Sequence, residues 1–301
     1  MSTDRRGALI AFCFIAGLAA PTLGWGLALM GFTRADFPID YAAVVMVCLC
    51  IYAPVLVFLN NPGERRSRFE QLTHFAWLWF FANAGFQLAW ELPWFLLKET
   101  LMYGNITEAD TWFWPWWAYG VADTRYLSHH DLTLGISAMD GSVALLEAFA
   151  VYLFFRGYRV KAAWLGLIFG ACMSWGQFFF YIGEIYNGFA HIEDGWFGFW
   201  MKYGVMNLPW CVFPFAATVG FMWFLAVTYK KRGVEEYLAG RQIGLDTPFV
   251  AQSELYLTVG PEGDPIAPPA NDRQLRRLSA LMFASPFVVL GVDALLWMQR
   301  F

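Results

Sequence analysis

A few ionisable side chains interrupt stretches of the sequence that are otherwise strongly apolar. They are Glu91, Asp140, Glu147 and Asp293, with Glu184 at the end of a further stretch. A charged group in a membrane-spanning stretch is costly and usually faces the protein interior, so each of these residues is a functional candidate. Their uncharged polar companions are Gln87, Ser137, Gln177 and Asn207.

The spacing of the polar residues predicts shared helix faces. Residues three, four or seven apart lie on the same side of an α-helix. Four sets have this spacing, namely Gln87 with Glu91, Ser137 with Asp140, Gln177 with Tyr181 and Glu184, and Asn207 with Trp210.

The depth of these residues follows from the helical rise of about 1.5 Å per residue. Counted from one side of the membrane, Glu91 lies about 9 Å down and Asp140 about 12 Å down. Asn207 and Trp210 lie about 6 and 10 Å from that side. We therefore expect the polar groups to meet in one layer, whereas Glu147, about 22 Å down, lies off that layer.

Two carboxyl groups that face one another in an apolar layer suit acid–base chemistry. A low dielectric favours the neutral carboxyl group, so Glu91 can act as a general acid. Asp140 on the facing helix would be the base, or the counter-charge of a cation. The face of Trp210 would stabilise that cation by about 2 kcal/mol, unless the ring is only an interfacial anchor. Gln87 and Asn207 would hold the carboxyl groups in place.

Two other interpretations of the layer stay open at this stage. A hydrogen-bond network that only ties helices together would have the same spacing. A proton-relay or transporter site is the second alternative, although the paired, interrupted half-helices of transporters are not evident in the sequence.

The composition assigns the chain to the membrane proteins. Of the 301 residues, 58% are hydrophobic, 20% are aromatic and 15% are charged, with a mean hydropathy of +0.44. A soluble domain has about a quarter charged residues. The net charge of −4 excludes nucleic-acid binding as a function class. The five cysteines lie in apolar stretches and fit neither a zinc site nor a secreted disulfide framework.

Seven apolar stretches of sufficient length predict seven transmembrane helices. They cover residues 7–32, 41–60, 74–97, 132–155, 162–183, 203–229 and 278–299. Fifteen of the 20 Lys and Arg residues fall on the side of the N-terminus and five on the other side. This asymmetry predicts a cytoplasmic N-terminus and a C-terminus on the opposite side.

The two longest connections have different compositions. Residues 98–131 contain the run TWFWPWW at 111–117, which indicates an interfacial aromatic belt or a lid over a lipid-accessible cavity. Residues 230–277 are basic at first and then rich in Gly, Pro and Asp, which predicts a flexible cytoplasmic linker.

Four motifs follow one another along the chain: QLAWE at 87–91, YGVADTRY at 119–126, YIGEIYNGFAH at 181–191 and MNLPW at 206–210. In their order and spacing they resemble the emopamil-binding protein family, also called EXPERA-domain proteins. This family includes sterol delta-8 to delta-7 isomerase and the sigma-two receptor. The resemblance implies an EXPERA-like five-helix catalytic core over residues 40–229. Residues 1–39 and 278–301 would each add a transmembrane helix.

The resemblance also implies an activity and a set of site residues. The isomerase protonates an alkene to a carbocation inside the membrane and removes a proton elsewhere on the ring. Glu91, Asn207 and Trp210 match the glutamate, asparagine and tryptophan of the family. Gln87 stands where the isomerase has histidine, and the alignment puts Ser137 at the second glutamate of the family and Asp140 at its threonine. One carboxyl group has therefore moved by one helical turn.

We therefore expect an all-α, seven-helix membrane isomerase that shifts a carbon–carbon double bond in a sterol or other polycyclic isoprenoid. The expected catalytic residues are Glu91 and Asp140, and the expected substrate or cation contacts are Gln87, Ser137, Tyr181, Glu184, Asn207 and Trp210. The alternatives are a non-catalytic sterol- or lipid-binding protein and a cyclase or epoxide isomerase that uses related cationic chemistry.

The same reasoning extends to partners and location. Cationic amphiphilic amines are expected to inhibit by mimicking the carbocation, and a homodimer is compatible with the sequence. We expect no cofactor and no metal, because His129, His130 and His191 lack helical ligand spacing and indicate solvated loops. The host membrane would be the endoplasmic reticulum in a eukaryote or the inner membrane in a bacterium.

Overall fold

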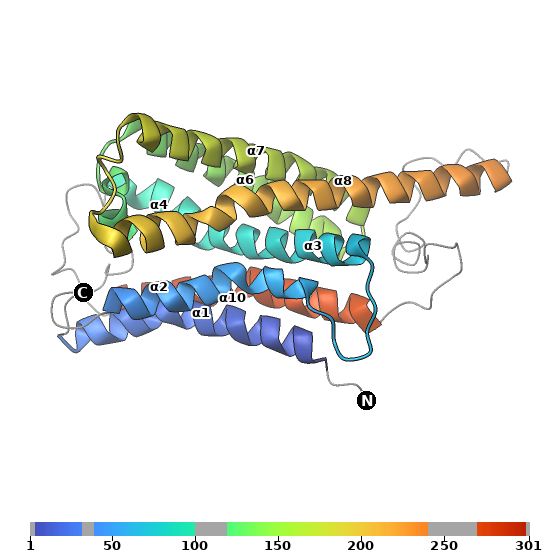
Figure 1. Ribbon diagram of the computed structural model, residues 1–301, viewed down its shortest axis with the longest axis horizontal. Helices are drawn as coiled ribbons and strands as arrows, with labels where there is room; N and C mark the ends of the chain where they lie inside the picture. The colour runs from blue at the N-terminus through green and yellow to red at the C-terminus, as the bar shows by residue number, and fades with distance from the viewer. Residues whose placement is uncertain (1–3, 32–38, 100–118, 240–269, 299–301) are drawn as a thin grey trace.

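The computed structural model describes residues 4–31, 39–99, 119–239 and 270–298, and seven long helical segments run side by side in this part of the chain (Figure 1). The first three are α1 (Arg5–Leu29), α2 (Ile39–Tyr52) with the 3-10 helix η1 (Ala53–Phe58), and α3 (Arg68–Phe86), which continues through the π-helix η2 (Gln87–Glu91) and α4 (Leu92–Leu97). A short 3-10 helix, η5 (Thr124–Leu127), precedes the other four. These are α6 (Asp131–Phe155), α7 (Arg159–Tyr186), the π-helix η6 (Phe197–Val205) with α8 (Met206–Ala239), and α10 (Ala270–Met298).

Each of the seven predicted apolar stretches falls on one of these segments, and the all-helical class is confirmed for the described residues. Within the described segments, four helices are long and apolar enough to cross a membrane, and they cover Asp131–Phe155, Arg159–Tyr186, Phe197–Lys230 and Arg273–Val292. A shorter apolar helix covers Val44–Phe58. The structure is therefore compatible with that of a multi-pass membrane protein.

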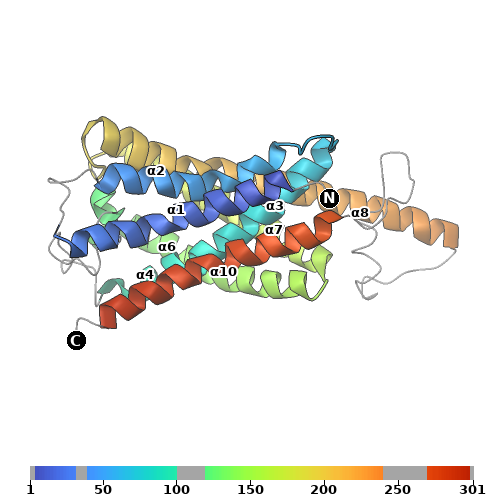
Figure 2. The same cartoon turned by 90° about the horizontal axis from the view of Figure 1, so that it is seen from below.

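Consecutive segments alternate in direction along the bundle (Figures 1 and 2). The connections at 59–67 and 156–158 lie at the same end as the N-terminus, and the connection at 187–196 lies at the opposite end with the C-terminus. Helix α8 extends beyond the rest of the bundle at the N-terminal end (Figure 1).

Two predicted connections differ from the structure or lie outside it. Helix α8 continues to Ala239 and α10 begins at Ala270, so both ends of the predicted 230–277 linker are helical. Residues 240–269 between them, and the run at 111–117, lie outside the described residues, as does the side chain of Asp293.

The core of the bundle is aromatic and centres on α3. The ring of Trp77 lies 4.8 Å from the rings of Phe154 on α6 and Phe221 on α8, and Phe81 lies 4.7 Å from Phe154. Tilted and edge-to-face contacts of this kind add to the free energy that burial provides. Three helices are thereby held around one cluster of rings.

Helix α3 begins and ends at positions that the local sequence determines. Ser67 accepts a hydrogen bond from the backbone N–H of Glu70, and the Glu70 side chain accepts one from the backbone N–H of Ser67. This capping box fixes the first turn. At the other end Pro93 has no N–H to bond the carbonyl group of Ala89, and the backbone changes to π-helix before it.

A glycine allows α3 to approach α10 closely. A Cβ atom on Gly85 would lie 2.8 Å from the carbonyl oxygen of Phe283 and 3.0 Å from that of Met282. Pro286 lacks the N–H that would bond the Met282 carbonyl in a regular helix, which leaves that oxygen at the α3 surface. Small residues at such crossings are typical of membrane helices.

We expect Gly85→Ala to lower the free energy of unfolding by about 1–3 kcal/mol, because α3 and α10 must separate to accommodate the methyl group. The matched control is Gly135→Ala on α6, where nothing lies within 4 Å of the added Cβ. This control should be neutral or stabilising by up to about 1 kcal/mol. Thermal unfolding in detergent measures both, and equal stability of the two variants would contradict the close approach.

Candidate functional site

The structure brings Gln87, Glu91 and Asp140 together where η2 packs against α6. The carboxyl group of Asp140 interacts electrostatically with that of Glu91 and is reached by the side chain of Gln87. Gln87 and Asp140 are buried, and Glu91 is half-buried. Two carboxyl groups from facing helices therefore share one site.

Several oxygen atoms at this site have no hydrogen-bond partner among the described residues. They are Oε1 of Gln87, Oγ of Ser137 and Oδ1 of Asp140, and all three side chains are at least nine-tenths buried. The amide nitrogen of Gln87 donates to the sulfur of Met173 at 3.7 Å, a weak acceptor. Buried polar atoms almost always have partners, so this arrangement suits a polar ligand, a proton or a water.

Two tyrosines that sequence reasoning did not place in the site face the same carboxyl groups. Tyr119 interacts electrostatically with Glu91 and Asp140, and Tyr126 with Glu91. The two tyrosine rings lie 4.8 Å apart. Burial and then the neighbouring acidic groups raise the pKa of Tyr119, which therefore keeps its hydroxyl hydrogen. The motif at 119–126 begins with Tyr119 and ends with Tyr126, so the motif itself could have indicated that these residues belong to the site.

The backbone of the site is irregular. Residues Gln87–Glu91 form a π-helix, in which the N–H of Leu92 bonds the carbonyl oxygen of Gln87, five residues back. Such wide turns occur mostly at functional sites because they shift side chains away from the regular helical register. Gln87 and Glu91 are therefore offset from the simple i,i+4 relation that the sequence predicted.

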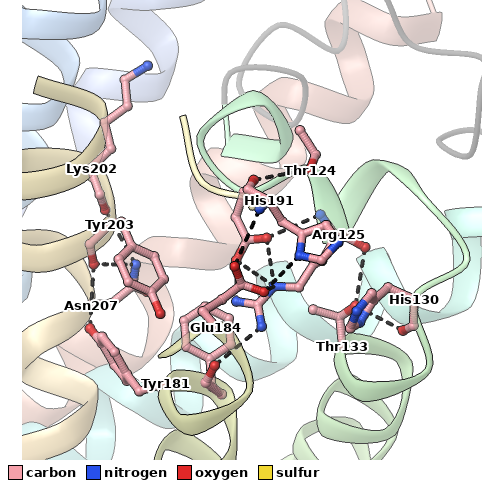
Figure 3. A network of polar contacts seen from close by, with 12 residues as sticks. Thr124, Arg125, His130, Thr133, Tyr181, Glu184, His191, Lys202, Tyr203 and Asn207 are labelled. Atoms are coloured by element: carbon pink, nitrogen blue, oxygen red, sulfur yellow. Dashed lines mark hydrogen bonds and ion pairs between the residues drawn. The ribbon is translucent and has the colours of Figure 1, made fainter. Parts of the chain in front are cut away.

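Glu184 lies in a second polar network, near the C-terminal end of α7 (Figure 3). Its Oε1 atom is 3.4 Å from Nε of Arg125 and 2.9 Å from Nδ1 of His191. Arg125 also donates to Asp123 at 2.6 Å, and its guanidinium group lies 4.3 Å from the centre of the Phe180 ring. Glu184 was expected to contact substrate, but in the structure it is buried in an ion-pair network.

The histidines take part in the same network. The rings of His130 and His191 lie 5.1 Å apart, and His191 bonds the buried Glu184 carboxyl group. Burial lowers the pKa of His130, and the cationic groups of His191 and Arg125 add to the effect. These two partly exposed residues are thus parts of a structural contact between loops.

Tyr181 and Asn207 bind the irregular backbone of η6. The amide nitrogen of Asn207 donates to the carbonyl oxygens of Tyr203 at 2.9 Å and Lys202 at 3.3 Å, and the Tyr181 hydroxyl donates to Tyr203 at 3.4 Å (Figure 3). A π-helix leaves such carbonyl groups without regular partners, so these side chains stabilise it.

Trp210 packs into the aromatic core. Its ring lies 5.1 Å from Trp79 in an edge-to-face contact and 6.4 Å from Phe86. The structure therefore places Trp210 against other rings of α3, whereas the rings of Tyr119 and Tyr126 contact Trp90 and Trp94 on the η2 and α4 segments.

In the part of the chain that the structure describes, no three His, Cys, Asp or Glu side chains come together as ligands for a metal ion. Comparisons of the chain with protein-family models, with curated proteins and with solved structures found no match. The proposed function therefore rests on the site itself and on the sequence motifs.

The Arg125 network yields a stability prediction. Arg125→Leu leaves the buried carboxylates of Asp123 and Glu184 without their cation, so we expect a loss of about 3–5 kcal/mol in the free energy of unfolding. Adding Asp123→Asn and Glu184→Gln should restore part of it. Arg5→Leu, at an exposed arginine, is the control and should change stability by less than about 0.5 kcal/mol. Indistinguishable melting of the Arg5 and Arg125 variants would show that the network contributes nothing.

Proposed function

We propose that the protein is a membrane-embedded isomerase that shifts a carbon–carbon double bond in a sterol or another polycyclic isoprenoid. The observation that carries the proposal is the meeting of Glu91 and Asp140 in an apolar helical bundle. The four motifs that resemble the EXPERA family give the substrate class. The unpaired oxygens of Gln87 and Ser137 add polar groups that could orient a substrate hydroxyl.

The reaction moves one proton in each of two steps. The Glu91 carboxyl group donates its proton to one alkene carbon, and the electron pair of the double bond forms the new C–H bond. The neighbouring carbon becomes a carbocation. Asp140 then removes a proton from an adjacent carbon, and the electrons of that C–H bond form the new double bond. The proton passes from Asp140 to Glu91 before the next turnover.

The aromatic residues beside the carboxyl groups stabilise the cation in this mechanism. Tyr119 and Tyr126 supply those ring faces, and electrostatic attraction of a cation to such a face is strongest where water is excluded. Trp210, expected in this role from the sequence, contacts Trp79 and Phe86 and stays a further candidate for it. Amphiphilic amines would compete with substrate by placing an ammonium group at the same position.

A non-catalytic sterol-binding protein is the second candidate. Gln87 and Ser137 stand where the motif resemblance expects a histidine and a glutamate, so the acid–base set differs from that of the isomerase. The same unpaired oxygens would then hold a sterol hydroxyl group without chemistry.

Conservative substitutions separate the two candidates. Glu91→Gln and Asp140→Asn should each lower turnover by about 100-fold to 10,000-fold, because each removes one proton-transfer group. Folding should survive, since an amide of nearly equal shape can still form hydrogen bonds. Turnover is measured by mass spectrometry of the sterols in membranes that contain each variant.

The matched control is Asp131→Asn, which makes the same chemical change on the same helix at an exposed position. It should retain full turnover. Full turnover in both Glu91→Gln and Asp140→Asn would exclude the mechanism. Sterol binding without any turnover in the wild-type protein would favour the non-catalytic binding protein.

We also propose that all seven segments cross the membrane, with the N-terminus in the cytoplasm. The alternation of the segments and the excess of Lys and Arg at the N-terminal end support this orientation. A protease site inserted near Gly263 should be protected in intact cells, whereas a tag after Phe301 should be accessible from the other side. Cleavage at the inserted site by protease added outside the cells would show that the protein has the opposite orientation.

A further inference from the structure

A second amide and a second carboxyl group face each other one turn from Gln87 along α3 and two turns from Asp140 along α6. The amide nitrogen of Asn83 on α3 donates to Oε1 of Glu147 on α6 at 3.3 Å, and both side chains are fully buried. Glu147 lies seven residues after Asp140 on the same face of α6, and their carboxyl groups interact electrostatically. The pairs Asn83–Glu147 and Gln87–Asp140 therefore follow one another between antiparallel helices.

The Asn83–Glu147 pair has one hydrogen-bond donor too few for its buried acceptor oxygens. Oδ1 of Asn83 and Oε2 of Glu147 are both buried and have no partner among the described residues. Both atoms only accept hydrogen bonds while Glu147 is ionised. A proton on Oε2 would supply the missing donor, and a protonated acid and an amide can then satisfy each other with two complementary hydrogen bonds.

The surroundings of Glu147 also favour a neutral carboxyl group. Among the described residues the groups that act on the Glu147 carboxyl group are Asn83 and Asp140, and neither is a cation. An ionised carboxylate without a cationic partner is costly to bury. Within about two turns along the same two helices, the rings of Trp77, Phe81 and Phe154 pack together.

We propose that Glu147 carries a proton in the working protein, so that the Asn83–Glu147 pair is neutral. Two nearby carboxyl groups do not readily ionise together, so a proton held on Glu147 leaves Asp140 to serve as the base. Glu147 is then a positioning residue that acts through Asp140. This role rests on the proposed isomerase function; the protonation of Glu147 does not.

Infrared absorption of the full-length protein in detergent at pH 7 tests the protonation directly. We expect two C=O bands of protonated carboxyl groups. One belongs to Glu91 and disappears in Glu91→Gln, and the other disappears in Glu147→Gln and shifts in frequency in Asp140→Asn. The control Asp131→Asn should leave both bands unchanged. Loss of carboxylate absorption instead of a C=O band in Glu147→Gln would overturn the proposal.

A double variant guards against a failure of Glu147→Gln to fold. Asn83→Leu with Glu147→Leu replaces both partners by apolar side chains of similar size, which is often nearly neutral for stability. It should remove the C=O band assigned to Glu147. Persistence of the band would assign it to another carboxyl group and would contradict the proposal.

The pH dependence of kcat/KM tests the effect on Asp140, which Glu91 and Tyr119 also face. If Glu147 is neutral, Glu147→Gln exchanges one uncharged group for another, and the acid limb of the profile should not move. A shift of that limb to lower pH would mean that a negative charge had been removed, and would overturn the proposal. Should the protein show no turnover, the isomerase function fails, while the infrared result still determines the state of Glu147.

Discussion

Carboxyl groups are buried between α3 and α6 without a cation beside them among the described residues. The arrangement of the bundle depends on which other groups donate hydrogen bonds to these carboxyl groups. Asp140 is reached by Gln87, and Glu147 by Asn83, so each acid on α6 faces an amide from the neighbouring helix. An amide donates to a carboxyl oxygen but leaves the second oxygen without a donor. The protonation state of these acids is therefore part of the packing, and the same property makes Glu91 and Asp140 suitable for moving protons.

Buried carboxyl groups are stabilised differently around Arg125 and around Asp140. Asp123 and Glu184 are paired with Arg125, and His191 completes that network near the C-terminal end of α7. The pairing of both carboxylates with Arg125 stabilises the contact between loops. The region around Asp140 has no such cation among the described residues and retains unpaired oxygens, which are available for chemistry.

The sequence predicted the helices, because they depend on regular hydrophobic periodicity, and depth counted along straight helices gave the expectation that Glu91 and Asp140 meet. It did not predict the π-helix at Gln87–Glu91, which arises where Pro93 and the packing on α6 act together. Nor did it place Glu184 with Arg125, since a loop residue has no periodic relation to a helix. It also did not predict that Asn83 on the neighbouring helix bonds Glu147, two turns from Asp140.

The central claim is that a proton enters the substrate at one carbon and leaves it at another. The most direct measurement is incubation of membranes containing the protein with candidate sterols in deuterated water, followed by mass spectrometry and location of the label. The isomerase account predicts a product with a shifted double bond that carries deuterium at the carbon Glu91 protonates. Tight sterol binding with neither a shifted double bond nor deuterium in the recovered sterol would contradict it.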